Sequence, residues 1–363
     1  MKTKNLKSVI MLTAVLAMAA VFSACKGNGN EPSGGGTDNG NNDVNDVYIV
    51  GSSVNDNYEN PTLWKNGVAQ LLPKISTKMG GFASSVFVDG TDVYIGGRDD
   101  DHSKPVLWKN GVEQKLSSNG AAFFGGGGTY VFVSGSDVYA AGYINNPTLW
   151  KNGVQQPLEN SGDGNVTSVF VSNGDVYVAG NSGSYTPILW KNGGAIVLDN
   201  TRQGLANSVF IQDSDVYVAG YEYTAYVGGA QYPVLWKNGE KQILSCKASN
   251  YAKNYSTAAS VFVSGSDVYV AGTDCYYDND NNYHCSAVLW KNGELQTLSD
   301  TGKFSDAYSV YVLNGDVYMV GSIRVSNSDV VDKAALWKNG KLQTLKVNAD
   351  GESVAYSVFV VKK

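Results

Sequence analysis

Four short apolar runs recur in every unit of a repeat that fills most of this chain. In residues 260–298 the runs are SVFV, DVYVAG, AVLWK and ELQTL, and turn residues separate them. The first three runs are apolar at consecutive positions, which is typical of strands covered on both faces, because a half-solvated strand alternates. The pattern therefore predicts units of four strands, each packed between similar units.

The repeat can be counted from its tryptophans. The chain has seven Trp residues, each within LWKNG, at Trp64, Trp108, Trp150, Trp190, Trp236, Trp290 and Trp337. They lie 40 to 54 residues apart, and seven copies of DVY accompany them, starting at Asp46, Asp92, Asp137, Asp175, Asp215, Asp267 and Asp316. A period of this length with four strands per unit is typical of a β-propeller blade. A solenoid would need atypical polar repeats at its two ends, which this sequence lacks.

The two ends of the repeat region complement each other. The N-terminal unit begins at DVYIVG, residues 46–51, without an SVFV run before it, and the C-terminal unit stops after SVFV. If residues 357–361 pair beside residues 47–50, seven whole blades close into a ring that has no free sheet edge. We therefore predict an all-β, seven-bladed propeller of four-stranded blades, in which the last strand completes the first blade.

The turns divide the ring into two unlike ends, because adjacent strands in a blade run antiparallel. At the uniform end, four residues always join the first two strands, and Asn-Gly, the signal of a two-residue type I′ turn, always joins the last two. At the long-loop end, the links vary widely in length and composition. Binding residues tend to lie on variable loops of a rigid scaffold, so we expect function at the long-loop end. The alternative is that these insertions are merely tolerated.

The recurring charges receive a structural interpretation. Every LWKNG contains a Lys and every DVY an Asp. We interpret the Lys as flanking its hairpin and the Asp as capping a turn, because a catalytic site needs one asymmetric constellation.

The first 45 residues differ from the repeat. Residues 1–24 combine a basic start with an apolar stretch from Val9 to Val21, which indicates a secretory signal peptide. FSAC, ending at Cys25, resembles a bacterial lipobox, and this resemblance implies cleavage before Cys25 and lipidation of that residue. Lys26 after the Cys favours the outer membrane. The lipidated Cys and a Gly/Asn-rich flexible tether would occupy residues 25–45, and the propeller residues 46–363. The alternative is an ordinary signal peptide with an incidental Cys.

The whole repeat unit resembles a known kind of protein. SVFVSGSDVYVAG followed by PVLWKNGELQTLS is similar to the WKNG-type repeat of uncharacterised propeller lipoproteins from bacterial cell envelopes, and loosely to Kelch-type blades. The resemblance covers residues 46–361. It implies the fold and an exported, envelope location, and it carries no catalytic residue.

Charge and histidine content narrow the range of partners and of catalytic mechanisms that this chain can have. The formal net charge is −6, and it becomes −9 without Lys2, Lys4 and Lys7 of the signal segment. Nucleic acids and anionic membrane surfaces need a basic patch, so we expect no nucleic-acid partner and membrane contact through the lipid alone. The two His residues, His102 and His284, lie in different blades, so Ser-His-Asp or Cys-His catalysis has almost no base available. Paired carboxylates remain open. We expect a monomer.

Tyrosines gather in two long links and in the crossing between them. The links are YEYTAYVGGAQY, residues 221–232, and TDCYYDNDNNYHCS, residues 273–286. An exposed Tyr offers a flat apolar ring and a polar tip, which suits a sugar or a protein surface. The candidate ligand-binding residues are Tyr221, Tyr223, Tyr226, Tyr232, Tyr251, Tyr276, Tyr277 and Tyr283. The alternative is that these loops pack on one another.

The second link also contains cysteines and carboxylates. We expect Cys275 and Cys285 to form a disulfide in an exported protein, but Cys246 at the same end could compete for either partner. The three Cys and His284 match no standard zinc spacing. Asp278, Asp280 and Asn282 alternate as the first ligands of a calcium loop do, which makes calcium the one cofactor candidate. Tyr283 and Leu289 then depart from that pattern, and a solvated acidic loop is the alternative.

Three functional hypotheses remain. The leading hypothesis is a lipid-anchored binding module for a glycan or a protein, which uses the long-loop end. The second is a polysaccharide-acting hydrolase or lyase that uses carboxylates at that end. The third is a structural envelope protein without a dedicated ligand.

Overall fold

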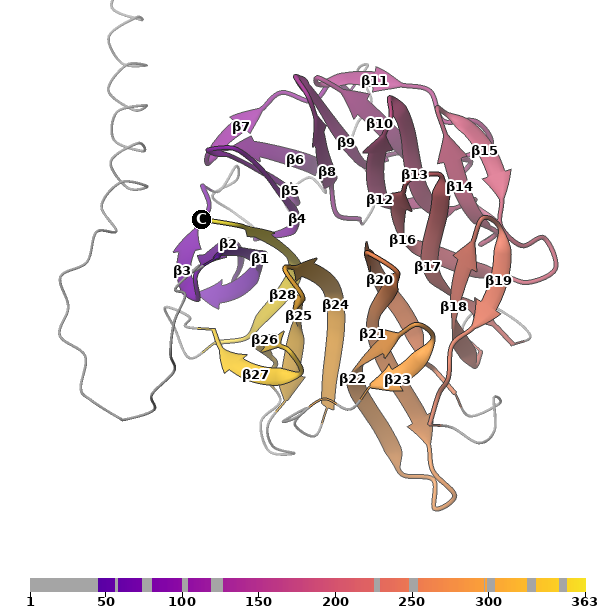
Figure 1. Cartoon of the computed structure of the whole chain (residues 1–363). Helices are drawn as coiled ribbons and strands as arrows, with labels where there is room; N and C mark the ends of the chain where they lie inside the picture. The colour runs from indigo at the N-terminus through magenta and orange to yellow at the C-terminus, as the bar shows by residue number, and fades with distance from the viewer. Residues whose placement is uncertain are drawn as a thin grey trace, which may run out of the picture. The chain divides into compact units, whose positions relative to one another are not determined.

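All the regular elements that the structure describes are β-strands (Figure 1). The computed structural model describes residues 45–55, 58–73, 80–99, 104–118, 127–224, 229–247, 254–296, 298, 304–324, 331–345 and 351–363. The strands form four-stranded antiparallel sheets, apart from one parallel pair, Cys285 opposite Phe304, which joins two of these sheets. Within the described ranges, no helix is long and apolar enough to cross a membrane.

Each four-stranded sheet forms one blade, and we number the blades along the chain and give the strands of each from the inner to the outer edge. Blade 1 contains β28 (Ser353–Val361), β1 (Asp46–Asn55), β2 (Tyr58–Lys65) and β3 (Val68–Leu71). Blade 2 contains β4 (Gly81–Asp89), β5 (Asp92–Asp99), β6 (Lys104–Lys109) and β7 (Val112–Gln114). Blade 3 contains β8 (Tyr130–Ser134), β9 (Asp137–Ile144), β10 (Asn146–Lys151) and β11 (Val154–Gln156).

The remaining strands follow the same order. Blade 4 contains β12 (Asn165–Ser172), β13 (Asp175–Asn181), β14 (Pro187–Lys191) and β15 (Gly194–Val197). Blade 5 contains β16 (Gly204–Gln212), β17 (Asp215–Tyr223), β18 (Gln231–Lys237) and β19 (Glu240–Ile243). Blade 6 contains β20 (Thr257–Ser264), β21 (Asp267–Tyr277), β22 (Tyr283–Lys291) and β23 (Glu294–Gln296). Blade 7 contains β24 (Phe304–Leu313), β25 (Asp316–Arg324), β26 (Lys333–Lys338) and β27 (Lys341–Thr344).

The last strand of the chain belongs to the first blade. β28 pairs antiparallel with β1, with Val47 opposite Val360 and Val50 opposite Ser357, which is the pairing that the incomplete terminal repeats predict. Each inner strand contacts the inner strand of the next blade, and β28 contacts both β24 and β4. The two ends of the propeller chain are therefore held in one sheet.

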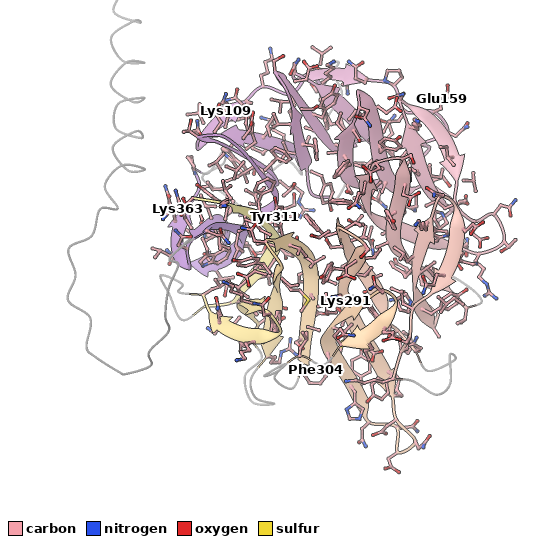
Figure 2. All side chains as sticks on the ribbon, viewed as in Figure 1. Lys109, Glu159, Lys291, Phe304, Tyr311 and Lys363 are labelled. Atoms are coloured by element: carbon pink, nitrogen blue, oxygen red, sulfur yellow. A yellow bond between two sulfur atoms is a disulfide. The ribbon has the colours of Figure 1, made fainter. Side chains whose placement is uncertain are left out.

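Seven aromatic side chains, one from each inner strand, contact one another in a closed series. The centroids of adjacent rings lie 4.7 to 5.0 Å apart. We call this set the channel ring; Tyr311 is labelled in Figure 2, and the members are Phe87, Phe132, Phe170, Phe210, Phe262, Tyr311 and Phe359. Such tilted aromatic contacts contribute about 0.5–1.5 kcal/mol each beyond burial.

The serine of SVFV connects neighbouring blades. Its hydroxyl oxygen accepts a hydrogen bond from the Val amide of the next blade at 3.1 to 3.3 Å. These serines are Ser85, Ser168, Ser208, Ser260, Ser309 and Ser357. In blade 3, Tyr130 stands at the serine position. The recurring SVF run thus supplies contacts between blades, both through the hydroxyl and through the ring.

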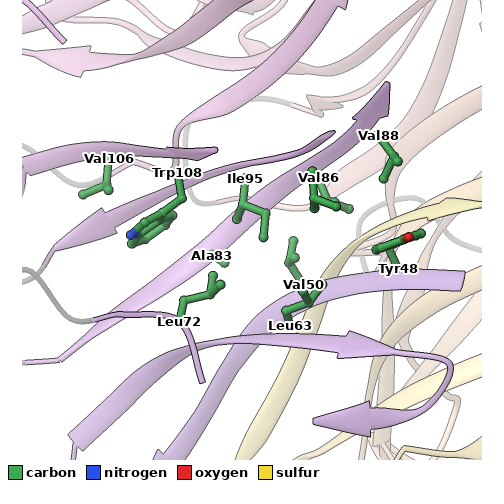
Figure 3. Close-up of a cluster of buried hydrophobic side chains, with 11 residues drawn as sticks. Tyr48, Val50, Leu63, Leu72, Ala83, Val86, Val88, Ile95, Val106 and Trp108 are labelled. Carbon is green, nitrogen blue, oxygen red and sulfur yellow. The ribbon is translucent and has the colours of Figure 1, made fainter. Parts of the chain in front are cut away.

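The tryptophans fill the space between blades. All seven are at most 2% exposed. Trp108 of blade 2 packs with Val50 and Leu63 of blade 1 (Figure 3), and Trp64 of blade 1 packs with Val320 of blade 7 in the same manner. In blades 2 to 6, the Gly that follows the VYxx run leaves room for the indole: a Cβ on Gly220 would overlap the Leu205 carbonyl oxygen and lie 3.0 Å from the Trp236 ring.

Candidate functional site

The uniform end contains the same polar unit in every blade. In blade 4, Asp175 accepts a hydrogen bond from Asn192 Nδ2 at 2.7 Å and pairs with Lys191 Nζ at 2.8 Å. Asn192 Oδ1 accepts a hydrogen bond from the Val176 amide at 2.8 Å, and its φ of 51° suits the type I′ turn. The Asp and the Lys are thus bound to each other, and the backbone amide of the turn is capped by the Asn and not by the Asp.

This unit neutralises the charges of the uniform end. All seven LWKNG lysines pair with the DVY Asp of their own blade. Hydrogen bonds from Lys191 and Asn192 lower the pKa of the Asp175 carboxyl, and the corresponding bond raises the pKa of Lys191. A cavity of about 310 Å³ lies between blades 2 and 3 at this end, and Asp92 holds its Lys109 at 2.6 Å. The uniform end is therefore a repeated structural surface.

The hairpin β21–β22 is the most extended feature of the long-loop end (Figure 1). Cys275 and Cys285 lie opposite each other in it and form a disulfide, which is the pairing expected from the sequence. Cys246, which the sequence left as a competitor, is a free thiol. Asn254 Nδ2 lies 3.2 Å from its Sγ, and burial raises the pKa of the thiol to about 11.

Four aromatic rings contact one another in series along this hairpin. The ring centroids are 6.0 Å apart between Tyr255 and Tyr277, 5.0 Å between Tyr277 and Tyr283, and 6.3 Å between Tyr283 and Phe304. Tyr277 and Tyr283 are 40% and 41% exposed. We call Tyr255, Tyr277, Tyr283 and Phe304 the aromatic strip. It extends from the crossing between blades 5 and 6 to the first residue of β24.

The tip of the hairpin is organised by Asp278. Its Oδ1 accepts hydrogen bonds from the Asp280 and Asn282 amides at 2.9 and 2.8 Å, and its Oδ2 from Asn282 Nδ2 at 3.1 Å. His284 Nε2 lies 2.9 Å from the same Oδ2, and the His284 ring stacks on Tyr276. Within the described ranges, no group of three His, Cys, Asp or Glu residues could hold a metal ion. The calcium assignment of Asp278, Asp280 and Asn282 stays a prediction, and both Asp278 oxygens already serve the turn.

The tyrosines of blade 5 lie in a different environment. Tyr221 and Tyr223 are half-buried and contact edge to face, with centroids 5.5 Å apart. Tyr232 is only 6% exposed and donates a hydrogen bond to Glu222 Oε2 at 2.9 Å. Tyr232 is therefore buried and not exposed as the sequence suggested, and its hydroxyl serves a buried carboxylate. Tyr226, Tyr251 and the predicted anchor Cys25 lie outside the described residues.

Glu222 belongs to a charged cluster between blades 4 and 5. Lys241 Nζ lies 2.9 Å from Glu222 and 2.5 Å from Asp199. Glu222 is 0% exposed, and burial raises the pKa of its carboxyl even though Lys241 and Tyr232 oppose that shift. Lys241 therefore connects β17 with the segment that follows β15, which is a structural role.

A cavity of about 130 Å³ lies among the inner strands, and all seven of them contribute to its lining. The lining is polar but uncharged, and its larger side chains include Tyr130, Thr167, Asn207, Tyr308 and Tyr356. Burial raises the pKa of Tyr130 and of Tyr356 to about 12, and it raises that of Tyr308 as well. The three phenols therefore stay protonated at neutral pH and can donate hydrogen bonds.

Sequence reasoning missed several of these residues. Phe304 joins the strip only because β22 and β24 meet at Cys285 and Phe304, which no sequence pattern indicates. Tyr130, Tyr308 and Tyr356 could have been found from the sequence. Tyr130 stands where the other blades have the Ser of SVFV, and Tyr308 and Tyr356 stand one residue earlier, where the other blades have Ser, Thr, Asn or Ala. A side chain that breaks a sevenfold repeat is a candidate for a site.

Comparisons with known proteins identify no family for this chain. No family model matches this sequence. No curated protein matches it either. Among solved structures, the chain is similar to the computationally designed Ika8 protein at 12% identity and a TM-score of 0.45, with 87% of this chain and 96% of that chain covered. It is also similar to the WD40 β-propeller domain of Doa1, at 14% identity and a TM-score of 0.43, with 76% of this chain and 86% of that chain covered. A third similar structure is YCF48 bound to D1 peptide, at 11% identity and a TM-score of 0.48, with 79% of this chain and 90% of that chain covered. At these low values, the propeller assignment rests on the strand pairing described above.

Proposed function

We propose that this protein is a binding module of the bacterial cell envelope that recognises a glycan through the aromatic strip. The observation that carries this proposal is the exposure of Tyr277 and Tyr283, 40% and 41%, within a continuous series of ring contacts. A sugar ring has an apolar C–H face that packs on a flat aromatic ring and hydroxyls that bond to phenols and amides. Exposed Asp280, Asn281 and Asn282 supply such polar groups beside the strip.

The strip is held in place before any ligand arrives. The disulfide joins β21 to β22 next to its exposed tyrosines, and Tyr277 lies directly opposite Tyr283 in the strand register. Tyr255 is tied to the same hairpin, because its amide donates to the Cys275 carbonyl oxygen at 2.7 Å. Preorganised rings lose less conformational freedom on binding, which favours affinity.

The test is a glycan array probed with residues 26–363, followed by titration calorimetry on the sugars that bind. Replacement of both Tyr277 and Tyr283 by Ala should weaken binding by about 5- to 150-fold, because two stacking contacts of about 0.5–1.5 kcal/mol each are lost. Tyr185→Asn is the matched control: Tyr185 is 43% exposed in the blade 4 link, and Asn tolerates its positive φ.

The outcomes separate the three hypotheses. Binding that requires the two tyrosines supports the glycan module. Shortening of a bound oligosaccharide during incubation would indicate the hydrolase or lyase instead. Absence of binding to every sugar on the array contradicts the proposal and leaves a protein ligand or a purely structural role.

The proposed envelope location depends on the N-terminal segment. We infer that residues 1–24 direct export and that Cys25 is lipidated, with residues 26–45 as a tether. Incorporation of labelled palmitate in a bacterial host should occur with the natural chain and be lost in Cys25→Ser. Equal labelling of the two proteins would contradict the lipid anchor without affecting the glycan proposal.

A further inference from the structure

One face of β24 leads from the aromatic strip to the central cavity. Phe304, Asp306 and Tyr308 occupy alternate positions on this strand and are partly exposed, whereas Ser305 and Ala307 between them are buried. Phe304 belongs to the aromatic strip and Tyr308 lines the cavity. Tyr308 is the unpaired residue of a β-bulge between Ala307 and Ser309, and exposure alternates along β24 up to this residue, so these three side chains form a row.

Asp306 is the polar residue in the middle of this row. It accepts a hydrogen bond from Thr273 Oγ1 at 3.1 Å, and its charge acts on both Tyr283 of the strip and Tyr308 of the cavity. Arg324 and Asp332 also act on it, but they pair with each other at 2.9 Å. A carboxylate in this position can accept hydrogen bonds from the hydroxyls of a sugar.

The cavity wall differs between its two sides. Ser84, Thr167 and Asn207 each donate a hydrogen bond to a carbonyl of the next blade, at 2.6 to 2.8 Å. The corresponding residues of blades 6, 7 and 1 are Ala259, Tyr308 and Tyr356. Ala259 has no polar side chain, and the rings of Tyr308 and Tyr356 contact each other with centroids 5.4 Å apart. The side nearest the aromatic strip therefore keeps the bridges of the SVFV serines but lacks the second set of bridges that Ser84, Thr167 and Asn207 make on the other side.

The size and chemistry of the cavity suit one sugar unit. Since a water molecule requires about 10–15 Å³ of such space, about 130 Å³ holds several waters or one ring that replaces them. The uncharged hydroxyl and amide lining matches a neutral polyhydroxyl group. The inner strands continue from the Ser residues that line the cavity to the channel ring, in which neighbouring side chains are in contact.

We propose that the aromatic strip, Asp306 and the central cavity form one continuous binding track that holds the end of a glycan chain, with the terminal sugar in the cavity. This inference rests on the proposed glycan binding and adds that the ligand is recognised at a chain end. A glycan chain that lies on the aromatic strip would place its terminal sugar in the cavity among the inner strands.

The decisive variant is Ala259→Asn. Asn207 occupies the equivalent position in blade 5, where its amide donates to the Ala258 carbonyl at 2.8 Å, so an Asn is compatible with this position. The variant should keep the thermal midpoint and the circular dichroism of the natural chain, and it should fill part of the cavity. Asp306→Asn and Tyr308→Phe are smaller changes that remove a charge and a hydroxyl.

The probes are cellohexaose, chitohexaose, laminarihexaose and mannohexaose, tested by calorimetry with the full chain from residue 26. For the sugar that binds best, Ala259→Asn and Asp306→Asn should each raise Kd at least about tenfold. The matching long-chain polysaccharide, at an equal concentration of sugar units, should bind in proportion to its few chain ends.

The results distinguish this inference from the proposed function. If the Tyr277 and Tyr283 variant loses binding while Ala259→Asn, Asp306→Asn and Tyr308→Phe bind normally, the glycan module stands and the chain-end track is overturned. Equal binding of the polysaccharide and the hexasaccharide per sugar unit would also overturn it. If none of the four hexasaccharides and no sugar on the glycan array binds, both proposals are contradicted.

Discussion

The two ends of this propeller use the same scaffold in opposite ways. At the uniform end, an Asp, an Asn and a Lys repeat in all seven blades and bind one another. At the long-loop end, the disulfide hairpin occurs in blade 6, and the buried charged cluster joins blades 4 and 5. This difference teaches that the repeated residues maintain the scaffold of seven blades, which we call the frame. The candidate binding residues lie where one blade departs from the repeat. The following changes test that division, beginning with the frame.

Removal of residues 357–363 should have the largest effect. It removes Val358 and Val360, which are 4% and 2% exposed, and opens the channel ring at Phe359. Burial of each apolar side chain contributes about 1.5–3 kcal/mol, so the loss of the two valines alone costs about 3–6 kcal/mol, a large part of the stability of a domain. Urea unfolding should lose its single transition. Removal of Lys362 and Lys363 alone is the control, and an unchanged midpoint in the longer deletion would contradict the role of β28.

Gly220→Ala should destabilise the frame by about 3 kcal/mol, because the added Cβ overlaps a backbone oxygen and presses on Trp236. Gly194→Ala is the matched control: the atom nearest to its Cβ would be 3.5 Å away, which is ordinary contact. Thermal unfolding of the two variants measures the difference. Similar midpoints would mean that the Gly–Trp pairing of the repeat is not a packing requirement.

Replacement of both Cys275 and Cys285 by Ser should act mainly on the long-loop end. The disulfide closes a loop with a sequence separation of 10, which in the chain-entropy model stabilises by about 2–3 kcal/mol at most. Hydrogen exchange should rise at residues 274–286, and glycan binding should weaken, while the other blades stay protected. Cys246→Ser provides the comparison with a free thiol. Faster exchange throughout the ring would show that the hairpin also supports the frame.

The smallest expected effect is a pH dependence of opposite sign at the two ends. Lys and Asn partners depress the pKa of Asp175 in the folded state, so its stabilising effect is present above the unfolded value of about 3.9 and is lost as pH falls below it. Burial raises the pKa of Asp306, so its contribution is lost as pH rises through its folded pKa. Relative to the natural chain, Asp175→Asn should therefore lower the urea midpoint at pH 7 and lower it less at pH 3. Asp306→Asn should change the midpoint more favourably at pH 7 than at pH 3. Urea midpoints at the two pH values measure both, and shifts of the same sign would contradict the assignment.

The sequence predicted the frame because its signals are local and repeated. Asn-Gly identifies each type I′ turn from two residues, and the incomplete runs at Asp46 and Ser357 indicate the pairing of β1 with β28. The site was only partly predictable, because loop composition does not determine which loops meet. Composition suggested exposed tyrosines in both long links, and Tyr277 and Tyr283 are exposed, whereas Tyr232 is buried. Tyr232 is buried because Glu222, ten residues earlier, requires a hydroxyl donor, and that contact has no sequence signature.

The pairing of Asp46 has a consequence for how the two ends of the propeller chain are joined. Asp46 begins β1 at the uniform end, where it pairs with Lys65 of its own blade and with Lys363, the last residue of the chain. In blade 1 the repeated Asp–Asn–Lys unit therefore includes a second lysine, which comes from the segment after β28. The carboxylate that serves the repeated unit thus also binds the final residue to the first strand, so that charge reinforces the closure made by the pairing of β1 with β28.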